Sequence, residues 1–213
     1  MTITKEQIAK DLLSIRAVFL KPDDPFTWAS GIHSPIYCDN RLTLSAPAVR
    51  KDVEAGLAEI VKKKFPEAEM LMGTSTAGIA HAAITATILD LPMGYVRSGH
   101  KDHGRQNQIE GKMEPGTKVV VIEDLISTGG SVLEVVDVLR QAGAQVLGIA
   151  SIFTYGLQKG VERLAAADVV NYSLSDFDTL SKVAAAEGYI ADKDIAKLTA
   201  FQKNPQDPAW MEL

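Results

Sequence analysis

Along the first 66 residues the apolar positions follow helical spacing, lose it, and then regain it. A first amphipathic helix is predicted after the capping-box sequence of residues 4–7, with an apolar face formed by Ile8, Leu12, Ile15 and Phe19. Prolines and glycines interrupt residues 22–35, and this stretch predicts a short hairpin or an irregular hood. A second helix is predicted from Ser45 to Pro66.

From Glu69 onward short apolar runs alternate with helical segments, which is the rhythm of βαβ units. The expected segments are 70–72, 77–89, 93–96, 119–122, 131–141 and 146–153, with weaker helices around 157–166, 176–187 and 192–203. The run at 119–122 is apolar without alternation, as expected of a central strand covered on both faces. The pattern predicts an α/β fold with a doubly wound parallel sheet core and a small N-terminal hood.

Length and composition agree with one such domain. The 213 residues, of which 46% are hydrophobic and 23% charged, can bury a sizeable core, so a disordered chain is excluded. We expect a hood over approximately residues 1–45, a sheet core over approximately 66–175 and C-terminal helices over approximately 176–213. The net charge of -5 argues against a general nucleic-acid binder, so any anion site must be local.

Cysteine usage and the terminal sequence indicate the compartment. The single cysteine, Cys38, cannot form an intrachain disulfide and is expected to be a small buried hydrophobic side chain. The first residues lack the charged-then-apolar order of a signal peptide, and the most apolar stretch, 79–89, is about half the length of a spanning helix. We therefore expect a cytoplasmic protein with no membrane segment.

The most informative segment is residues 119–131, with the sequence VVVIEDLISTGGS. A parallel strand that leads into a helix N-terminus exposes unpaired backbone N–H groups, and these form a cradle for phosphate. Taken alone, the acid pair Glu123 and Asp124 could simply end a strand. Next to a phosphate cradle the two acids would repel phosphate, so their expected partners are a ribose diol or a magnesium ion. The segment therefore predicts a site for a phosphorylated sugar.

The segment between 96 and 119 has no apolar periodicity, and a structureless loop of about twenty residues in a compact domain is usually functional. Between residues 97 and 105 the three bases Arg97, Lys101 and Arg105 outnumber the single acid, giving a charge of +2 (3 minus 1). A loop that closes over an anion would strengthen each charge pair by lowering the local dielectric. His100 and His103 lack further zinc ligands, and His33 and His81 are expected to be structural or surface residues.

The run at 119–131 resembles the phosphoribosyl-diphosphate binding motif of the type I phosphoribosyltransferases. Further segments bring the resemblance closer to the orotate branch of that family, namely residues 26–37 (FTWASGIHSPIY), 73–79 (GTSTAGI), and 95–97 (YVR) leading into 101–104 (KDHG). The resemblance covers roughly residues 5–190. The SGxxSP segment together with the KxH loop is specific to the orotate branch.

The resemblance implies a magnesium-dependent enzyme that transfers 5-phosphoribose from phosphoribosyl diphosphate to orotate. The products would be orotidine 5'-monophosphate and diphosphate, in the de novo synthesis of UMP. Mg2+ is the implied cofactor, with no direct side-chain ligand predicted. The implied partners are these small molecules and a second copy of the chain in a homodimer, with no nucleic acid and no membrane.

The family also implies a role for each matching residue. Glu123 and Asp124 would hold the ribose hydroxyls, and Ser127 would touch orotate as well as phosphate. The remaining phosphate-binding positions would be Leu125, Ile126, Thr128, Gly129, Gly130 and Ser131. Residues 73–78 would form a second diphosphate loop, and residues 36–37 would line the base pocket.

The catalytic residues implied by the family are Arg97, Lys101 and His103, which would also bind the diphosphate. They would lie on the 97–105 loop, which closes over the diphosphate in the active site of the neighbouring subunit. Either Lys101 or His103 is the candidate proton donor. Many relatives carry lysines where Ser98, Ala77 and Ala29 stand here, which bears on how much anion stabilisation each remaining cation must supply.

Two alternative functions stay open at this point. The motif at 123–131 also permits a phosphoribosyltransferase that acts on another base, although the segment at 30–35 argues against it. A non-catalytic regulator that senses phosphoribosyl diphosphate and contacts nucleic acid would show a basic face, whereas this chain is acidic.

Overall fold

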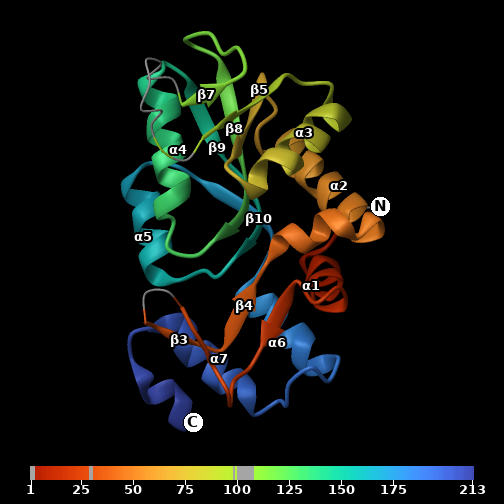
Figure 1. Ribbon diagram of the computed structural model, residues 1–213, viewed down its shortest axis with the longest axis vertical. Coiled ribbons are helices and arrows are strands. Elements are labelled where there is room, and N and C mark those ends of the chain that lie inside the picture. Colours follow the sequence, from red (N-terminus) through yellow and green to blue (C-terminus); the bar gives the residue numbers. More distant parts are fainter. Residues whose placement is uncertain (1–2, 29–30, 98, 100–107) are drawn as a thin grey trace.

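The computed structural model describes residues 3–28, 31–97, 99 and 108–213. Six strands form the central sheet in the order β10–β9–β8–β5–β6–β7, and all neighbours are parallel except β6 and β7 (Figure 1). Their bounds are β5 Met70–Thr74, β6 Met93–Val96, β7 Ile109–Glu110, β8 Lys118–Ile126, β9 Gln145–Thr154 and β10 Asn171–Asp176. The central strands β5 and β8 are almost wholly buried, which explains their uninterrupted apolar runs.

Helices cover both faces of this sheet, as Figure 1 shows. One face carries α1 Lys5–Ser14, α2 Pro47–Lys64 and α3 Ala77–Leu89, which share the larger hydrophobic core with side chains from β5, β8 and β9. The other face carries α4 Gly130–Gln141 and α5 Gln158–Ala166, and there Val132, Val136 and Leu139 of α4 pack on the sheet. The predicted α/β fold with a doubly wound sheet is confirmed.

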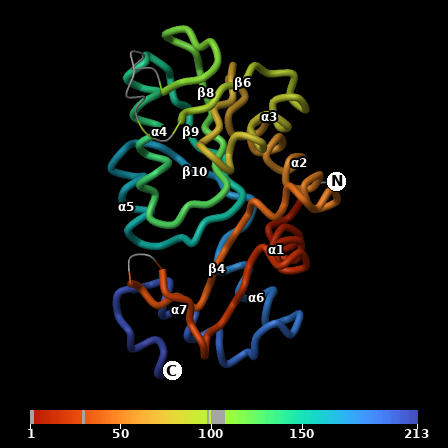
Figure 2. Tube along the Cα trace, in the orientation of Figure 1, coloured from red at the N-terminus to blue at the C-terminus, as the bar shows by residue number. Residues whose placement is uncertain are grey.

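The hood is built from both ends of the chain, as the tube in Figure 2 makes visible at the bottom of the molecule. Its elements are β1 Val18–Leu20, β2 Phe26–Thr27, β3 His33–Ser34, β4 Ile36–Cys38, η1 Asn40–Ser45, α6 Phe177–Ala186, α7 Asp194–Lys203 and η2 Pro208–Glu212. Trp28 stacks on Tyr155 at the end of β9, with ring centroids 5.7 Å apart, and meets Phe201 of α7 edge to face. These aromatic contacts join the hood to the sheet core.

One expected element was wrong, and two strands were not predicted. Helix α1 ends at Ser14, because Arg16 adopts φ +56° and residues 18–20 pair with β4, so Phe19 is a strand residue and 40% exposed. Strand β10 was missed, since its polar sequence NYSLSD lacks an apolar run. Strand β7 was missed because it has only two residues, and its antiparallel pairing makes the sheet mixed at that edge.

The side chains of Cys38, His33 and His81 follow the sequence expectations. Cys38 is buried, and His81 is fully buried, whereas His33 is an exposed residue of β3. No helix within the described residues has the length and apolar content needed to cross a bilayer.

Candidate active site

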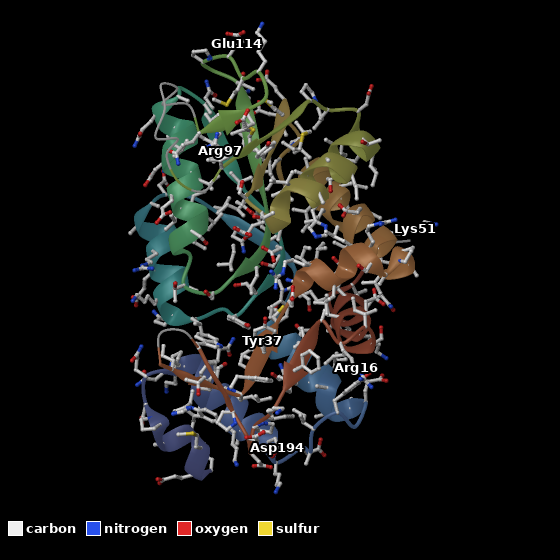
Figure 3. The ribbon with its side chains drawn as sticks, in the orientation of Figure 1. Arg16, Tyr37, Lys51, Arg97, Glu114 and Asp194 are labelled. Carbon is white, nitrogen blue, oxygen red and sulfur yellow. The ribbon has the colours of Figure 1, made fainter. Side chains whose placement is uncertain are left out.

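A cavity of about 300 Å³ opens where β5, β6 and β8 end at the same edge of the sheet. We call it the edge cavity, and its polar lining consists of Thr74, Ser75, Arg97, Gln108, Glu123, Asp124, Ser131 and Glu134. In Figure 3 Arg97 lies in the upper half of the molecule, and Tyr37 marks the junction between sheet core and hood. The carboxyl edge of a parallel sheet is where ligands of doubly wound folds bind.

The acid pair lies within the last residues of β8, which runs four residues further than the apolar run predicted. Glu123 is only 5% exposed, and the backbone N–H of Asp124 donates a 2.8 Å hydrogen bond to its carboxyl oxygen Oε1. Burial, together with the adjacent Asp124, raises the pKa of Glu123 to about 8, so Glu123 holds a proton at neutral pH. Asp124 is half-buried and supplies the second carboxyl group of the pair.

The turn after the acids leads directly into α4. Gly129 adopts φ +75° in the left-handed region that glycine favours, and α4 begins without a side-chain cap. The first N–H groups of the helix therefore remain available to an anion. Ile126 lines neither the edge cavity nor the turn's open side. Its side chain is buried in the α4 face of the core, and its carbonyl accepts from Tyr155 N at 2.9 Å.

Helix α5 contacts this turn and holds it in place. The side chain of Arg163 donates to the carbonyl oxygen of Thr128 at 3.3 Å. At Gly160 a Cβ atom would lie 2.7 Å from the carbonyl oxygen of Ser127, so only glycine permits this approach of α5 to the turn. The turn at 127–130 is thus held by contacts from a helix that the sequence motif does not include.

The loop between β5 and α3 forms the opposite wall. Thr74 Oγ1 donates to the carbonyl oxygen of Ile122 at 3.3 Å, and Ser75 Oγ donates to that of Val96 at 2.6 Å. The peptide bond between Ser75 and Thr76 is cis. A Cβ atom at Gly78 would come within 2.5 Å of the Ile122 carbonyl oxygen, so α3 starts in direct contact with the end of β8.

Of the three predicted catalytic residues only Arg97 lies within the described part of the chain. Its side chain lines the edge cavity, is 22% exposed, and donates from Nη1 to Glu110 Oε1 at 3.3 Å. Lys101 and His103 lie outside the described residues, as do His100, Arg105, Ser98 and Ala29. An anion in the edge cavity would compete with Glu110 for the Arg97 guanidinium.

A second and larger cavity, of about 730 Å³, separates the hood from the sheet core. We call it the hood cleft, and its lining residues include Trp28, Ile32, Ser127, Thr128, Lys159 and Lys203. Ser127 and Thr128 thus stand on the hood side of the acid pair, while Leu125 and Ser131 line the edge cavity. Ile36 is fully buried and Tyr37 is 43% exposed, and neither lines either cavity.

The structure adds residues that the sequence did not indicate. Gln108 and Glu134 line the edge cavity, and Lys159 and Lys203 line the hood cleft. Asn40 donates from its side-chain nitrogen to the backbone carbonyl of Asp124 at 2.6 Å across 84 positions of sequence. No local motif marks a contact between segments so far apart in the chain. Among the described residues, no three histidine, cysteine or carboxylate side chains lie close enough to hold a metal ion.

Known proteins of similar sequence and fold are orotate phosphoribosyltransferases and related proteins. The phosphoribosyl transferase domain model matches residues 43–181. The orotate phosphoribosyltransferase of Bacillus cytotoxicus is 59% identical over 207 residues, covering 97% of this chain and 99% of that protein. The crystal structure of the orotate phosphoribosyltransferase from Aeropyrum pernix has a TM-score of 0.74 at 29% identity, covering 86% of this chain and 99% of that one.

A longer protein shares the fold as well. The structure of Leishmania donovani UMP synthase has a TM-score of 0.80 at 25% identity and covers 93% of this chain, which corresponds to 42% of that protein.

Proposed function

The chain belongs to the orotate phosphoribosyltransferase family, and we propose that it transfers 5-phosphoribose from phosphoribosyl diphosphate to orotate. The products are orotidine 5'-monophosphate and diphosphate, a step of de novo pyrimidine synthesis. The observation that carries this proposal is the acid pair at the end of β8, which lies next to an uncapped helix start and between two cavities. Such a site can take a phosphorylated sugar on one side and a base on the other.

The ribose and its 5-phosphate occupy the segment from Glu123 to Ser131 in this proposal. The open N–H groups at the start of α4 bind the phosphate, and the hydroxyl groups of Ser127, Thr128 and Ser131 add hydrogen bonds. Asp124 accepts hydrogen bonds from the ribose diol, and the protonated Glu123 donates one. The Asp124 carboxyl group also stabilises positive charge that develops on the ribose ring as the bond to diphosphate breaks.

The departing diphosphate is stabilised by cations in the proposal. Arg97 lines the edge cavity and exchanges its bond with Glu110 for a bond with the diphosphate. Lys101 and His103 join it from the 97–105 loop, and one of them gives a proton to the leaving group. The hydroxyl groups of Thr74 and Ser75 line the same cavity from the β5–α3 loop.

Orotate binds in the hood cleft next to Ser127. Orotate carries a carboxylate, and the cleft offers Lys159 and Lys203, for which the described residues provide no ion-pair partner. The one acid of the cleft lining, Glu162, accepts a hydrogen bond from Gln158 at 2.7 Å. An anionic planar base therefore suits the charge and the aromatic wall that Trp28 provides.

Magnesium is the proposed cofactor, and the donor atoms of the edge cavity fit it. Mg2+ prefers oxygen ligands and is usually bound by one or two carboxylates together with substrate phosphates. The cavity presents the Asp124 carboxylate and the hydroxyl groups of Thr74 and Ser75, whereas Glu123 is protonated. When bound, the ion neutralises charge on the diphosphate. Asp124 would hold it from the protein side, which differs from the sequence expectation of no direct side-chain ligand, while the chain's own cations bind the remaining diphosphate oxygens.

A homodimer is proposed as the working form, with the 97–105 loop acting in the neighbouring subunit's site. Helix α3 supports this, since its sequence AGIAHAAITATIL contains no Asp, Glu, Lys or Arg. Ala82 and Ala86 face the core, but Ile88 is 48% exposed and Ile79 and Ala83 are half-buried. A helix without charged side chains is normally covered on most sides, and a second copy of the chain would cover the partly exposed face of α3. A cytoplasmic location also remains part of the proposal, because the single cysteine is buried and free.

The activity is tested by mixing the protein with orotate, phosphoribosyl diphosphate and magnesium and following the loss of orotate absorbance. Parallel reactions with uracil and hypoxanthine separate this enzyme from phosphoribosyltransferases for other bases. We expect loss of orotate alone. An unchanged orotate absorbance under these conditions would contradict the proposal.

A further inference from the structure

Five polar side chains that the mechanism does not use form a buried connection behind the site, which we call the buried brace. They are Asn40 and Thr43 of η1, Glu54 of α2, and His81 and Thr85 of α3, and each is at most 1% exposed. His81 Nδ1 lies 2.7 Å from Glu54 Oε1, and Thr85 Oγ1 donates to Glu54 Oε2 at 2.8 Å. Thr43 Oγ1 lies 3.5 Å from His81 Nε2 and donates to the Asn40 carbonyl oxygen at 2.6 Å.

Asn40 is the end of the brace that reaches the active site. Its Nδ2 donates to the Asp124 carbonyl oxygen at 2.6 Å, and its Oδ1 accepts from the Cys38 thiol at 3.2 Å. Both ends of the Asn40 amide are therefore occupied, which defines its orientation. Through Thr43 and His81 the same residue is connected to α3, the helix that follows the proposed diphosphate loop.

The backbone of β8 explains why a side chain is needed at this point. Strand β5 pairs with β8 only as far as Gly73 and Ile122, while the pairing of β8 with β9 continues to Ile126. Beyond Ile122 the β5 side of β8 therefore lacks a strand partner. The Asp124 carbonyl is the next on that side after the Ile122 carbonyl, and Asn40 donates to it where a strand would have done so.

Stability alone does not call for such a brace. Removing five polar groups from water is costly, and apolar side chains of similar size would fill the space at no such cost. The hydrogen bonds instead fix the orientation of the groups that they join. Asn40 holds the Asp124 carbonyl and the Glu123 carboxyl accepts from the Asp124 N–H, so both sides of that residue's backbone are fixed.

We propose that Asn40 is a positioning residue for the phosphoribose site, which sets the orientation of the acid pair and is itself held by Thr43, His81 and Glu54. The identity of the ligand rests on the proposed function. The hydrogen bond by which Asn40 fixes the Asp124 backbone does not depend on that function.

The ligand-binding test replaces Asn40 by alanine and measures the affinity for phosphoribosyl diphosphate with magnesium by calorimetry. We expect the dissociation constant to rise about tenfold, the effect of losing a hydrogen bond to a buried carbonyl. The KM for orotate at saturating phosphoribosyl diphosphate should stay within about twofold, since Asn40 does not line the hood cleft. If Asn40→Ala does not fold, Asn40→Asp serves, because its carboxylate has a similar shape but cannot donate.

The matched control is Asn171→Ala. Asn171 lies in β10, donates to Ser173 Oγ at 2.8 Å, and accepts from Ser151 Oγ at 3.0 Å, so its loss also breaks partly buried hydrogen bonds. It should lower the melting temperature without changing the affinity for phosphoribosyl diphosphate. If Asn40→Ala behaves in the same way, its role is only structural and the proposal is overturned.

A second readout separates the positioning role from the proposed function. Amide hydrogen exchange on the protein without ligands should be faster in residues 124–128 of Asn40→Ala than in wild type, and unchanged there in Asn171→Ala. Unchanged exchange in residues 124–128 would refute the proposal that Asn40 positions the acid pair. A wild-type protein that leaves orotate unconsumed would instead remove the proposed function, and the exchange result would stand by itself.

Discussion

The edge cavity and the hood cleft lie on two sides of one short segment, yet they differ in charge and construction. The edge cavity is small, and its acidic residues come from the end of β8 and from α4. The hood cleft is more than twice as large, and its two lysines come from α5 and α7. Under the proposed function, the edge cavity would perform the chemistry on sugar and diphosphate and the hood cleft would select the base.

The largest expected effect is on the diphosphate side of this division. Lys101→Ala should lower kcat about a thousandfold with a much smaller change in KM, because a cation aimed at the leaving group acts mainly in the transition state. Steady-state kinetics with both substrates varied will measure the split. The control is Lys112→Ala, whose ammonium group pairs with Glu114 on the surface. Equal turnover in Lys101→Ala and wild type would remove the catalytic role of Lys101.

A somewhat smaller effect is expected at the ribose. Asp124→Asn should lower kcat/KM for phosphoribosyl diphosphate about a hundredfold, since the amide cannot supply the negative charge that favours the ribose cation. The KM for orotate should change little. Asp137→Asn on the exposed side of α4 is the control for loss of one negative charge. If orotate KM rose as much as kcat/KM fell, the two cavities would not be separate in function.

The buried acid of the edge cavity predicts a pH dependence of stability. The pKa of Glu123 is about 8 in the fold against an ordinary value of 4.5, so the native state holds a proton that the unfolded state releases between these pH values. The free energy of unfolding should therefore fall by about 2 kcal/mol from pH 5.5 to pH 7.0. Urea titrations at the two pH values measure this change, and Glu123→Gln should not show it. The same fall in the free energy of unfolding in the variant would contradict a raised pKa of Glu123.

The smallest effect is expected in the hood cleft. Lys159→Ala or Lys203→Ala should each raise the KM for orotate about fivefold, the value of one partly exposed charge pair, and leave the affinity for phosphoribosyl diphosphate unchanged. Lys62→Ala, at the exposed end of α2, controls for the change in net charge. A rise in the dissociation constant for phosphoribosyl diphosphate instead would place these lysines at the phosphate.

The sheet core could be predicted from sequence because its signals are local. The uninterrupted apolar run at 119–122 marks a central strand, and the bounds of α3 and β6 match those read from the sequence. The acid pair could be recognised for the same reason, since strand, acids and glycines follow one another within thirteen residues.

What escaped prediction depends on distant contacts. The hood combines residues 18–45 with helices from the other end of the chain, and no periodicity shows that Trp28 will meet Tyr155 and Phe201. The hydrogen bond from Asn40 to Asp124 likewise joins two elements that only the completed sheet brings together. The raised pKa of Glu123 follows from burial, which the sequence of two adjacent acids does not reveal.

A crystal structure of the protein with orotidine 5'-monophosphate would show which cavity holds each part of the product, because the product must span both cavities. We expect the 5-phosphate at the N–H groups that begin α4, the ribose hydroxyls at Asp124 and Glu123, and the base beside Ser127 in the hood cleft. A base lying in the edge cavity, or a phosphate away from residues 127–131, would contradict this expectation.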